Sequence, residues 1–144
     1  MKKGLFIFLI FCFSLTIISC SDEEEDSTTD TTALVIAEVT VVTTVAGTGS
    51  TGSANGTGTS ASFNNPMGVT TDGTNLYVAD TSHLIRKIVI STGAVTTVAG
   101  TGSSGSANGT GTSASFYRPT GITRDGTNLY VSDTSNHLIR KIVL

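Results

Sequence analysis

Two histidine–carboxylate pairs stand out among the residues of this chain that could do chemistry. His83 follows Asp80 by three positions, and His137 follows Asp133 by four. A histidine beside a carboxylate can transfer protons or bind a metal ion. An aspartate in a tight turn can instead accept the backbone N–H bonds that close the turn. We favour the second interpretation because the pairs occupy equivalent turns, and we predict no catalytic residue, no metal site and no cofactor.

An internal repeat sets the positions of these residues. Residues 42–82 match residues 95–135 at an offset of 53, with 34 of 41 positions identical. Repeats of about this length are typical of propeller blades and solenoids, whose units cannot bury their apolar faces alone. An enzyme site needs unlike groups at one point, whereas two nearly identical copies supply the same few groups twice. The repeat therefore indicates an architecture more than an activity.

Each repeat has the pattern of short β-strands joined by tight turns. The dipeptide Asp72-Gly73 separates the β-prone runs 68–71 and 76–79, and glycine accepts the positive φ that a hairpin turn requires. Apolar residues do not recur at the spacing of a helix, and threonine and glycine are abundant. Four antiparallel strands per repeat are predicted, the last two over residues 84–90 and 94–99.

The second copy carries the motif of a known repeat. It contains Asp125-Gly-Thr-Asn-Leu-Tyr-Val131, then Asp133, and then Asn136-His137-Leu138. This pattern resembles the NHL repeat, which is named after that tripeptide, although the first copy lacks the asparagine and reads Ser82-His83-Leu84. The resemblance implies an all-β protein, a β-propeller with two four-stranded NHL-type blades, in a family whose rings usually contain six blades.

A count of strands predicts an incomplete ring. Residues 40–46 form a spare outer strand, residues 67–99 a full blade, and residues 120–144 three strands of a second blade. Each Å² of apolar surface left in water forfeits about 25 cal/mol, so something must cover the open faces. Either three copies close a six-bladed ring, with strands exchanged between neighbours, or the chain is a fragment of a longer gene.

Differences between the copies mark a candidate ligand-binding rim. Asn64 and Asn65 of the first copy are replaced by Tyr117 and Arg118 in the second. These positions lead into the innermost strand, near the mouth of a propeller channel, where ligands commonly bind. An aromatic ring beside a guanidinium can stack on a sugar or hold an anionic group. Drift of exposed residues is the simpler explanation of the same differences.

Two arginines on the strands are expected to have structural roles. The stems of Arg86 and Arg140 should cover apolar strand residues while their guanidinium groups pair with turn carboxylates or carbonyls. Tyr77 and Tyr130 are likewise expected to pack within the blades.

A glycine-rich connector over residues 47–63 recurs at residues 100–116. It lacks the Gly-Lys-Ser/Thr ending of a phosphate-binding loop, and we expect a flexible link anchored by Phe63 or Phe116. Its Asn-Gly-Thr sequences, at Asn55 and Asn108, match the N-glycosylation sequon and are interpreted as accidental.

The first twenty residues have the pattern of a targeting segment. Lys2 and Lys3 precede an apolar run too short to span a membrane, which predicts a signal peptide over residues 1–19. The run ends in Ile17-Ile18-Ser19-Cys20, which resembles the lipobox of bacterial lipoproteins and implies lipidation of Cys20. The alternative is an ordinary secretory signal with an incidental cysteine.

Residues 20–35 are predicted to be an acidic, disordered tether, because they are polar and charged with nothing to bury. Six of the eleven Asp and Glu residues lie there, so the folded region over residues 40–144 is nearly neutral despite the net charge of -3. The acidic run resembles a surface-export signal, or it is a plain spacer. No strongly basic face is evident, so a nucleic-acid partner is not expected.

These features together predict a lipoprotein of the cell envelope, on the outer membrane or the cell surface. Its NHL-repeat propeller would act as a binding or scaffold module for protein or carbohydrate. The alternative is a truncated remnant of a propeller enzyme, lactonase- or lyase-like, without independent activity. The predicted partners are the membrane through the lipid anchor, a protein or carbohydrate, and further copies of the chain in a homotrimer.

Overall fold

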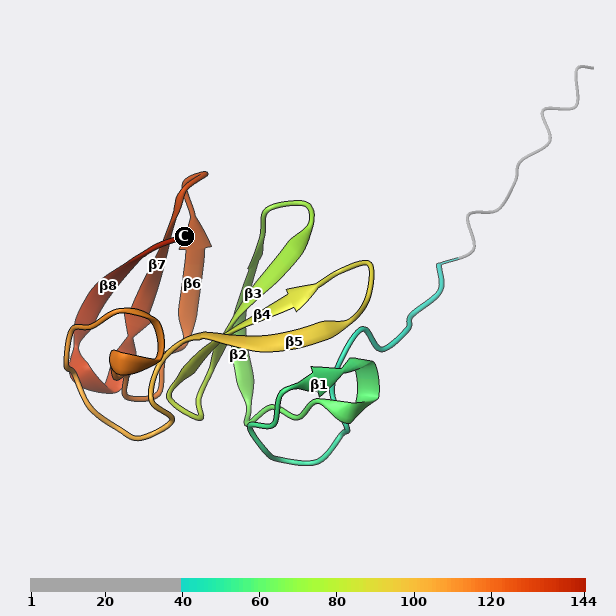
Figure 1. Ribbon diagram of the computed structural model, residues 1–144, viewed down its shortest axis with the longest axis horizontal. Coiled ribbons are helices and arrows are strands. Elements are labelled where there is room, and N and C mark those ends of the chain that lie inside the picture. The colour runs from blue at the N-terminus through green and yellow to red at the C-terminus, as the bar shows by residue number, and fades with distance from the viewer. Residues whose placement is uncertain (1–39) are drawn as a thin grey trace, which may run out of the picture. The chain divides into compact units, whose positions relative to one another are not determined.

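The computed structural model describes residues 40–144, whose strands form two sheets (Figure 1). The predicted signal peptide, the lipidation site Cys20 and the acidic tether lie outside the described residues. Within residues 40–144 the regular structure is antiparallel β-sheet with three single-turn 3-10 helices, so the all-β prediction is confirmed. No helix in this part of the chain has the length and apolarity needed to cross a membrane.

The first sheet, called blade one, contains the four strands predicted from the first repeat. Its strands pair in the order β2 (Pro66–Thr71), β3 (Asn75–Asp80), β4 (Leu84–Val89) and β5 (Ala94–Ala99), and each pair is antiparallel. A two-residue strand, β1 (Gly56–Thr57), pairs with β5 at the outer edge. Side chains alternate between the two faces of each strand, and the buried ones of blade one belong to two clusters, one on each face.

The second sheet, called blade two, contains three strands. They are β6 (Gly121–Arg124), β7 (Asn128–Asp133) and β8 (Leu138–Val143), again antiparallel. The register repeats that of blade one, since Tyr77 pairs with Lys87 there and Tyr130 pairs with Lys141 here. Among the described residues no strand pairs with the outer edge of β8. The single-turn helices are η1 (Gly58–Ser60), η2 (Gly111–Ser113) and η3 (Thr134–Asn136).

The spare outer strand predicted over residues 40–46 does not form. This segment has no regular secondary structure, and Val42 is 92% exposed. The prediction was wrong because a strand needs a partner edge for its N–H and C=O groups, and the structure offers this segment none within residues 40–144. Blade two therefore lacks the fourth strand that the segment was expected to supply.

An aspartate closes the hairpin at the start of each blade. Asp72 Oδ1 accepts the backbone N–H groups of Thr74 (2.9 Å) and Asn75 (2.6 Å), and Asp72 Oδ2 accepts the Tyr77 hydroxyl (3.0 Å). The Asn75 side chain, followed by these backbone donors, holds the pKa of Asp72 well below its usual range. Asp125 makes the equivalent bonds in blade two, with the same effect on its pKa. The Asp-Gly hairpins are thus formed as predicted.

The main hydrophobic core lies between the two blades. Tyr77, Ala79 and Ile85 of blade one pack in one cluster with Leu129 and Val131 of blade two. The same cluster includes Ala99, Ala114 and Phe116, at the connection into blade two. A smaller cluster lies on the other face of blade one and contains Ala61, Val78, Ile88 and Val95, with Ala46 packed against it.

The innermost strands of the two blades approach closely at Gly68. A Cβ atom at this position would lie 2.5 Å from the carbonyl oxygen of Thr120. Only glycine permits this approach, so Gly68 determines how close β2 and β6 can lie. The ends of the two connectors, which lead into these strands, are brought near each other as a result.

Candidate functional site

In each blade, one arginine bonds both a buried aspartate and the glycine-rich connector of the same repeat. We call this arginine and its partners the arginine clamp. In blade one, Arg86 and Asp80 are fully buried, with Arg86 Nη1 3.3 Å from Asp80 Oδ2. The guanidinium carbon lies 5.3 Å from the ring centroid of Phe63, within the range of a cation–π contact. The other hydrogen bonds go to the connector: Ser62 O (3.3 Å), Ala54 O (3.0 Å) and Asn55 Oδ1 (2.9 Å).

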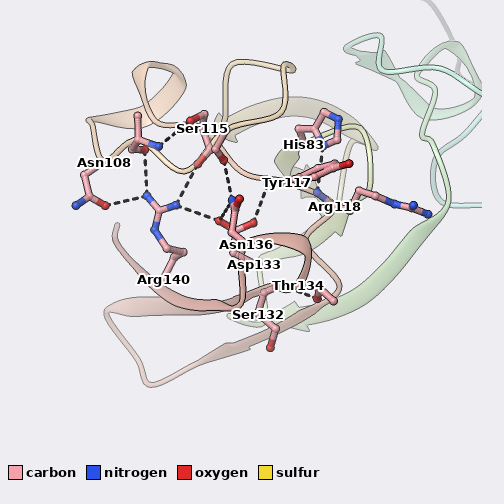
Figure 2. Close-up of polar contacts among 12 residues, drawn as sticks. His83, Asn108, Ser115, Tyr117, Arg118, Ser132, Asp133, Thr134, Asn136 and Arg140 are labelled. Carbon is pink, nitrogen blue, oxygen red and sulfur yellow. Dashed lines mark hydrogen bonds and ion pairs between the residues drawn. The ribbon is translucent and has the colours of Figure 1, made fainter.

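Blade two has the same clamp around Arg140 (Figure 2). Arg140 Nη1 lies 3.0 Å from Asp133 Oδ2, and the guanidinium carbon lies 5.2 Å from the Phe116 ring centroid. The connector partners are again equivalent: Ser115 O (3.1 Å), Ala107 O (3.1 Å) and Asn108 Oδ1 (2.9 Å). The predicted pairing of both arginines with a turn carboxylate and with carbonyls is confirmed.

The clamp orders the connector. Burial lowers the pKa of Arg86, and the charge and hydrogen bond of Asp80 counteract this effect. The second carboxylate oxygen, Asp80 Oδ1, accepts the backbone N–H groups of Asn64 (3.0 Å) and Ser82 (3.1 Å), the turn-closing role predicted for this aspartate. The connector is therefore folded around a charged centre, and the expectation of a flexible link was wrong. Its abundant glycine concealed the polar contacts that fix it.

The clamps differ at the asparagine that only the second repeat contains. Asn136 Nδ2 donates to Asp133 Oδ2 and to the carbonyl oxygen of Gly105, both at 2.8 Å (Figure 2). Blade one has no residue at this place in its sequence, which passes from Ser82 directly to His83. The asparagine of the tripeptide motif thus adds a second tie between the blade-two turn and its connector.

The two histidines have different environments. His83 Nδ1 accepts the backbone N–H of Arg118 (3.1 Å), and its ring contacts Tyr117 edge-on at 5.5 Å between centroids. His83 thereby links the β3–β4 turn of blade one to the entry of blade two. His137 is exposed and has a left-handed backbone with φ of 58° at the end of η3.

A polar hollow of about 290 Å³ lies where the two blades meet. It brings together Asn65 and Arg118, two of the four residues predicted for the rim, from equivalent positions of the two repeats. Both have a positive φ, 50° for Asn65 and 52° for Arg118, which is uncommon for residues other than glycine. The rest of the lining is Met67, Thr81, Thr120, Thr134 and Ser135.

Arg118 is the one charged residue among those that line the hollow. Arg118 is exposed, and its guanidinium forms no hydrogen bond or ion pair with residues 40–144; no carboxylate of that region lines the hollow. Figure 2 shows the Arg118 side chain directed away from the clamp of blade two. The hydroxyl oxygens of Thr120 and Thr134 are 2.6 Å apart and share a hydrogen bond. Such a surface can receive a negatively charged, hydroxyl-rich group.

The other two predicted rim residues lie outside this hollow. Asn64 is half-buried and is held through its backbone by Asp80. Tyr117 is held in the same way by Asp133 Oδ1 (2.7 Å), and its ring packs against His83 instead of lying beside the Arg118 guanidinium. The Tyr117 ring therefore does not line the hollow that Arg118 lines.

Two members of the clamps were not predicted from the sequence. Asn55 and Asn108 match a sequon that we interpret as accidental, yet their side-chain oxygens accept hydrogen bonds from Arg86 and Arg140. A signal was present, since both asparagines and both arginines occur at matching places in the two repeats.

The paired antiparallel sheets define this chain as a β-propeller fold built of blades. An auxiliary nutrient binding protein from Bacteroides ovatus is similar, with a TM-score of 0.58 and 29% identity over 65% of this chain and 26% of that protein. A protein of unknown function from Bacteroides thetaiotaomicron has a TM-score of 0.59 and 29% identity, over 62% of this chain and 24% of that one.

Curated relatives carry the repeat itself. NHL repeat-containing protein 2 from Bos taurus is 39% identical over 99 residues, and the same protein from Homo sapiens is 39% identical over 95 residues. These matches span 65% and 62% of this chain but 14% and 13% of those proteins. They support the assignment of the repeated region to the NHL-repeat family. No protein-family model matches the chain.

Proposed function

We propose that this chain is an extracytoplasmic binding module, held on the cell envelope by a lipid on Cys20. Its NHL-type blades would present the hollow at Asn65 and Arg118 to a carbohydrate that carries carboxylate groups. Two similarities support a binding role: the curated relatives contain NHL repeats, and the structural neighbour from Bacteroides ovatus is described as nutrient binding. The lipobox-like sequence before Cys20 supports the anchor.

The single observation that carries the ligand class is the composition of the hollow. A guanidinium recognises a carboxylate through charge-assisted, often bidentate hydrogen bonds. Arg118 is free to form them, and the surrounding amide and hydroxyl groups match the hydroxyl groups of a sugar. A uronic-acid oligosaccharide combines both features, whereas a neutral oligosaccharide would leave the guanidinium without a charged partner.

Calorimetric titration of the full chain with oligogalacturonate tests this proposal. We expect saturable binding that the uncharged galactose oligomer does not reproduce, and the variant Arg118→Gln should weaken it about tenfold, which corresponds to about 1.4 kcal/mol. Lys87→Gln is the matched control, because it removes a cation of blade one that does not line the hollow. Equal binding of the neutral oligomer, or of Arg118→Gln, would contradict the carbohydrate site.

Three further experiments address the remaining parts of the proposal. Metabolic labelling with radioactive palmitate should mark the chain in its bacterial host, and Cys20→Ser should abolish the label. A pulldown that retains an envelope protein in preference to carbohydrate would change the ligand class to protein. Hydrolysis of lactones by the purified chain would favour a propeller enzyme over both the binding module and an inactive remnant.

A further inference from the structure

One six-residue strand occurs twice in this chain in two different environments. Leu-Ile-Arg-Lys-Ile-Val forms β4 at residues 84–89 and β8 at residues 138–143. In blade one β5 pairs with this strand, and Ile85, which is 0% exposed, packs in the cluster that includes Leu129 and Val131 of blade two. In blade two the equivalent Ile139 is 74% exposed. Among the described residues, β8 therefore lacks both the outer strand and the following blade that β4 has.

The sequence of the covering strand also occurs twice. Val-Thr-Thr-Val-Ala occupies residues 95–99 of β5 and recurs at residues 42–46, which form no strand. The ends of the two segments nevertheless have equivalent contacts. Ala99 packs in the cluster that includes blade two, and Ala46 packs against the cluster on blade one.

The residues that follow confirm this equivalence. Gly100 N donates to Gly111 O (3.2 Å) as β5 leads into blade two, and Gly47 N donates to Gly58 O (3.1 Å) at the entry of blade one. The segment 42–46 therefore enters blade one just as β5 enters blade two. The segment therefore occupies the position of an outer strand, the fourth strand of a blade that would come before blade one.

We propose that this preceding blade is blade two of a second copy of the chain. Residues 42–46 of one copy pair with β8 of its neighbour, in the register that β5 and β4 show within the chain. That register joins Ile85 to Ala99 and Lys87 to Thr96. Carried to the neighbour, it places Ala46 opposite Ile139 and Thr43 opposite Lys141. The inference concerns assembly and does not depend on the ligand of the hollow.

The open faces of the two blades fit the same arrangement. Blade one has an apolar hollow of about 300 Å³ that includes Val69, Leu76 and Ile88. The equivalent residues of blade two, Ile122, Leu129 and Ile142, belong to the cluster that blade one covers through Tyr77, Ala79 and Ile85.

The covering residues have counterparts on the free face of blade two. These are Tyr130, Ser132 and Ile139, which line a shallow hollow there. Within one chain this face meets no other blade of the described region. A second copy can follow the first with the same rotation and translation that relate blade one to blade two. The free face of blade two in the first copy then packs on the apolar hollow of blade one in the second copy. The contact is head-to-tail, and repetition of such a contact closes a ring when the rotation between neighbours returns to the first copy. Three copies would supply the six blades that the NHL resemblance implies.

Cysteine crosslinking tests the register in the full chain with Cys12 and Cys20 replaced by serine. Cross-strand partners lie about 4.5–5.5 Å apart between Cα atoms, a distance that a disulfide spans. The double variant Thr43→Cys/Lys141→Cys replaces two exposed residues and should form covalent dimers and trimers on mild oxidation. The control Val45→Cys/Lys141→Cys, which is out of register by two residues, should remain largely uncrosslinked. Monomer in both variants, or equal crosslinking in both, would overturn the proposed pairing.

A second variant tests the face that the neighbour would cover. Ile139→Asp introduces a charge at a position that is exposed within one chain, so the blade itself should keep its circular dichroism spectrum. We expect the oligomer to fall to a single copy. The control Ile90→Asp changes another exposed isoleucine, 43% accessible and outside both proposed faces, and should leave the oligomer intact. An oligomer that survives Ile139→Asp unchanged would contradict the proposal.

Discussion

Blade one and blade two have almost the same sequence, but only blade one has all the strands of a blade. Blade one has four strands, and its β4 is buried between β3 and β5. Blade two has three strands, and the identical β8 sequence has exposed leucine and isoleucine side chains. Both sequences form the same strand in the same register, so the strand is encoded locally. Whether the side chains of this strand are buried depends on which neighbouring strand and blade are present.

The arginine clamps show the opposite behaviour. Arg86 and Arg140 have the same set of partners, although only one of the two blades is complete. Each arginine bonds only the connector and turn of its own repeat, although in blade one Thr97 of the outer strand β5 adds a 3.4 Å hydrogen bond to Asn55. The bonds of each arginine are therefore formed within one repeat, whereas the apolar faces of a blade depend on other blades.

The largest expected effect comes from breaking the blade-one clamp. Arg86→Met leaves Asp80 buried without a cation, which should lower the free energy of unfolding by about 3–5 kcal/mol. Arg140→Met should cost less, because the Arg140 side chain is partly open to water. Urea unfolding of the two variants measures the difference. The double variant Arg86→Met/Asp80→Asn removes the unpaired charge and should recover part of the loss, whereas equal losses in the two blades would contradict this ranking.

An intermediate effect is expected from the asparagine that distinguishes the blades. Asn136→Ala removes two hydrogen bonds at the blade-two turn and should lower the free energy of unfolding by about 1–3 kcal/mol. Hydrogen exchange should accelerate in the connector at Gly105, which accepts one of these bonds. Thr112→Ala, at an exposed position of the same connector, is the control. Unchanged exchange at Gly105 would show that the tie is not needed.

The smallest effect concerns the hairpin aspartates, which should not distinguish the blades. The pKa values of Asp72 and Asp125 are lowered in the folded chain, so the ionised forms are stabilised. Their contribution is present above the ordinary carboxylate pKa of about 4 and is lost as the pH falls below it. Thermal melts from pH 6 to pH 2 should show a shallower acid loss for Asp72→Asn and a similar change for Asp125→Asn. An unaltered pH slope in both would contradict the hairpin account.

The sequence predicted the strands and turns well because their signals are local. An Asp-Gly dipeptide between β-prone runs specifies a hairpin without reference to the rest of the fold. The repeat then extended each assignment to the second copy. What failed were assignments that depend on distant partners: residues 40–46 have the sequence of β5 but no partner edge, and the connector owes its order to Arg86, which lies more than twenty residues further along the chain.

The candidate site was predicted in part for the same reason. Position in the repeat was enough to place Asn65 and Arg118 near the innermost strands, where the hollow lies. Adjacency in sequence suggested that Tyr117 would join Arg118 there. The positive φ of Arg118 and the contact with His83 separate the two side chains, and neither could be inferred from residue types alone.

The comparison of the blades rests on one claim, that the uncovered edge and face of blade two are completed by the equivalent segment of another copy. Sedimentation equilibrium of the full chain in mild detergent tests this claim most directly, because it gives the mass of the assembly without assuming its shape. We expect three copies in a closed complex that does not grow with concentration. A single compact copy at all concentrations, with β8 amides as protected from exchange as those of β4, would contradict it.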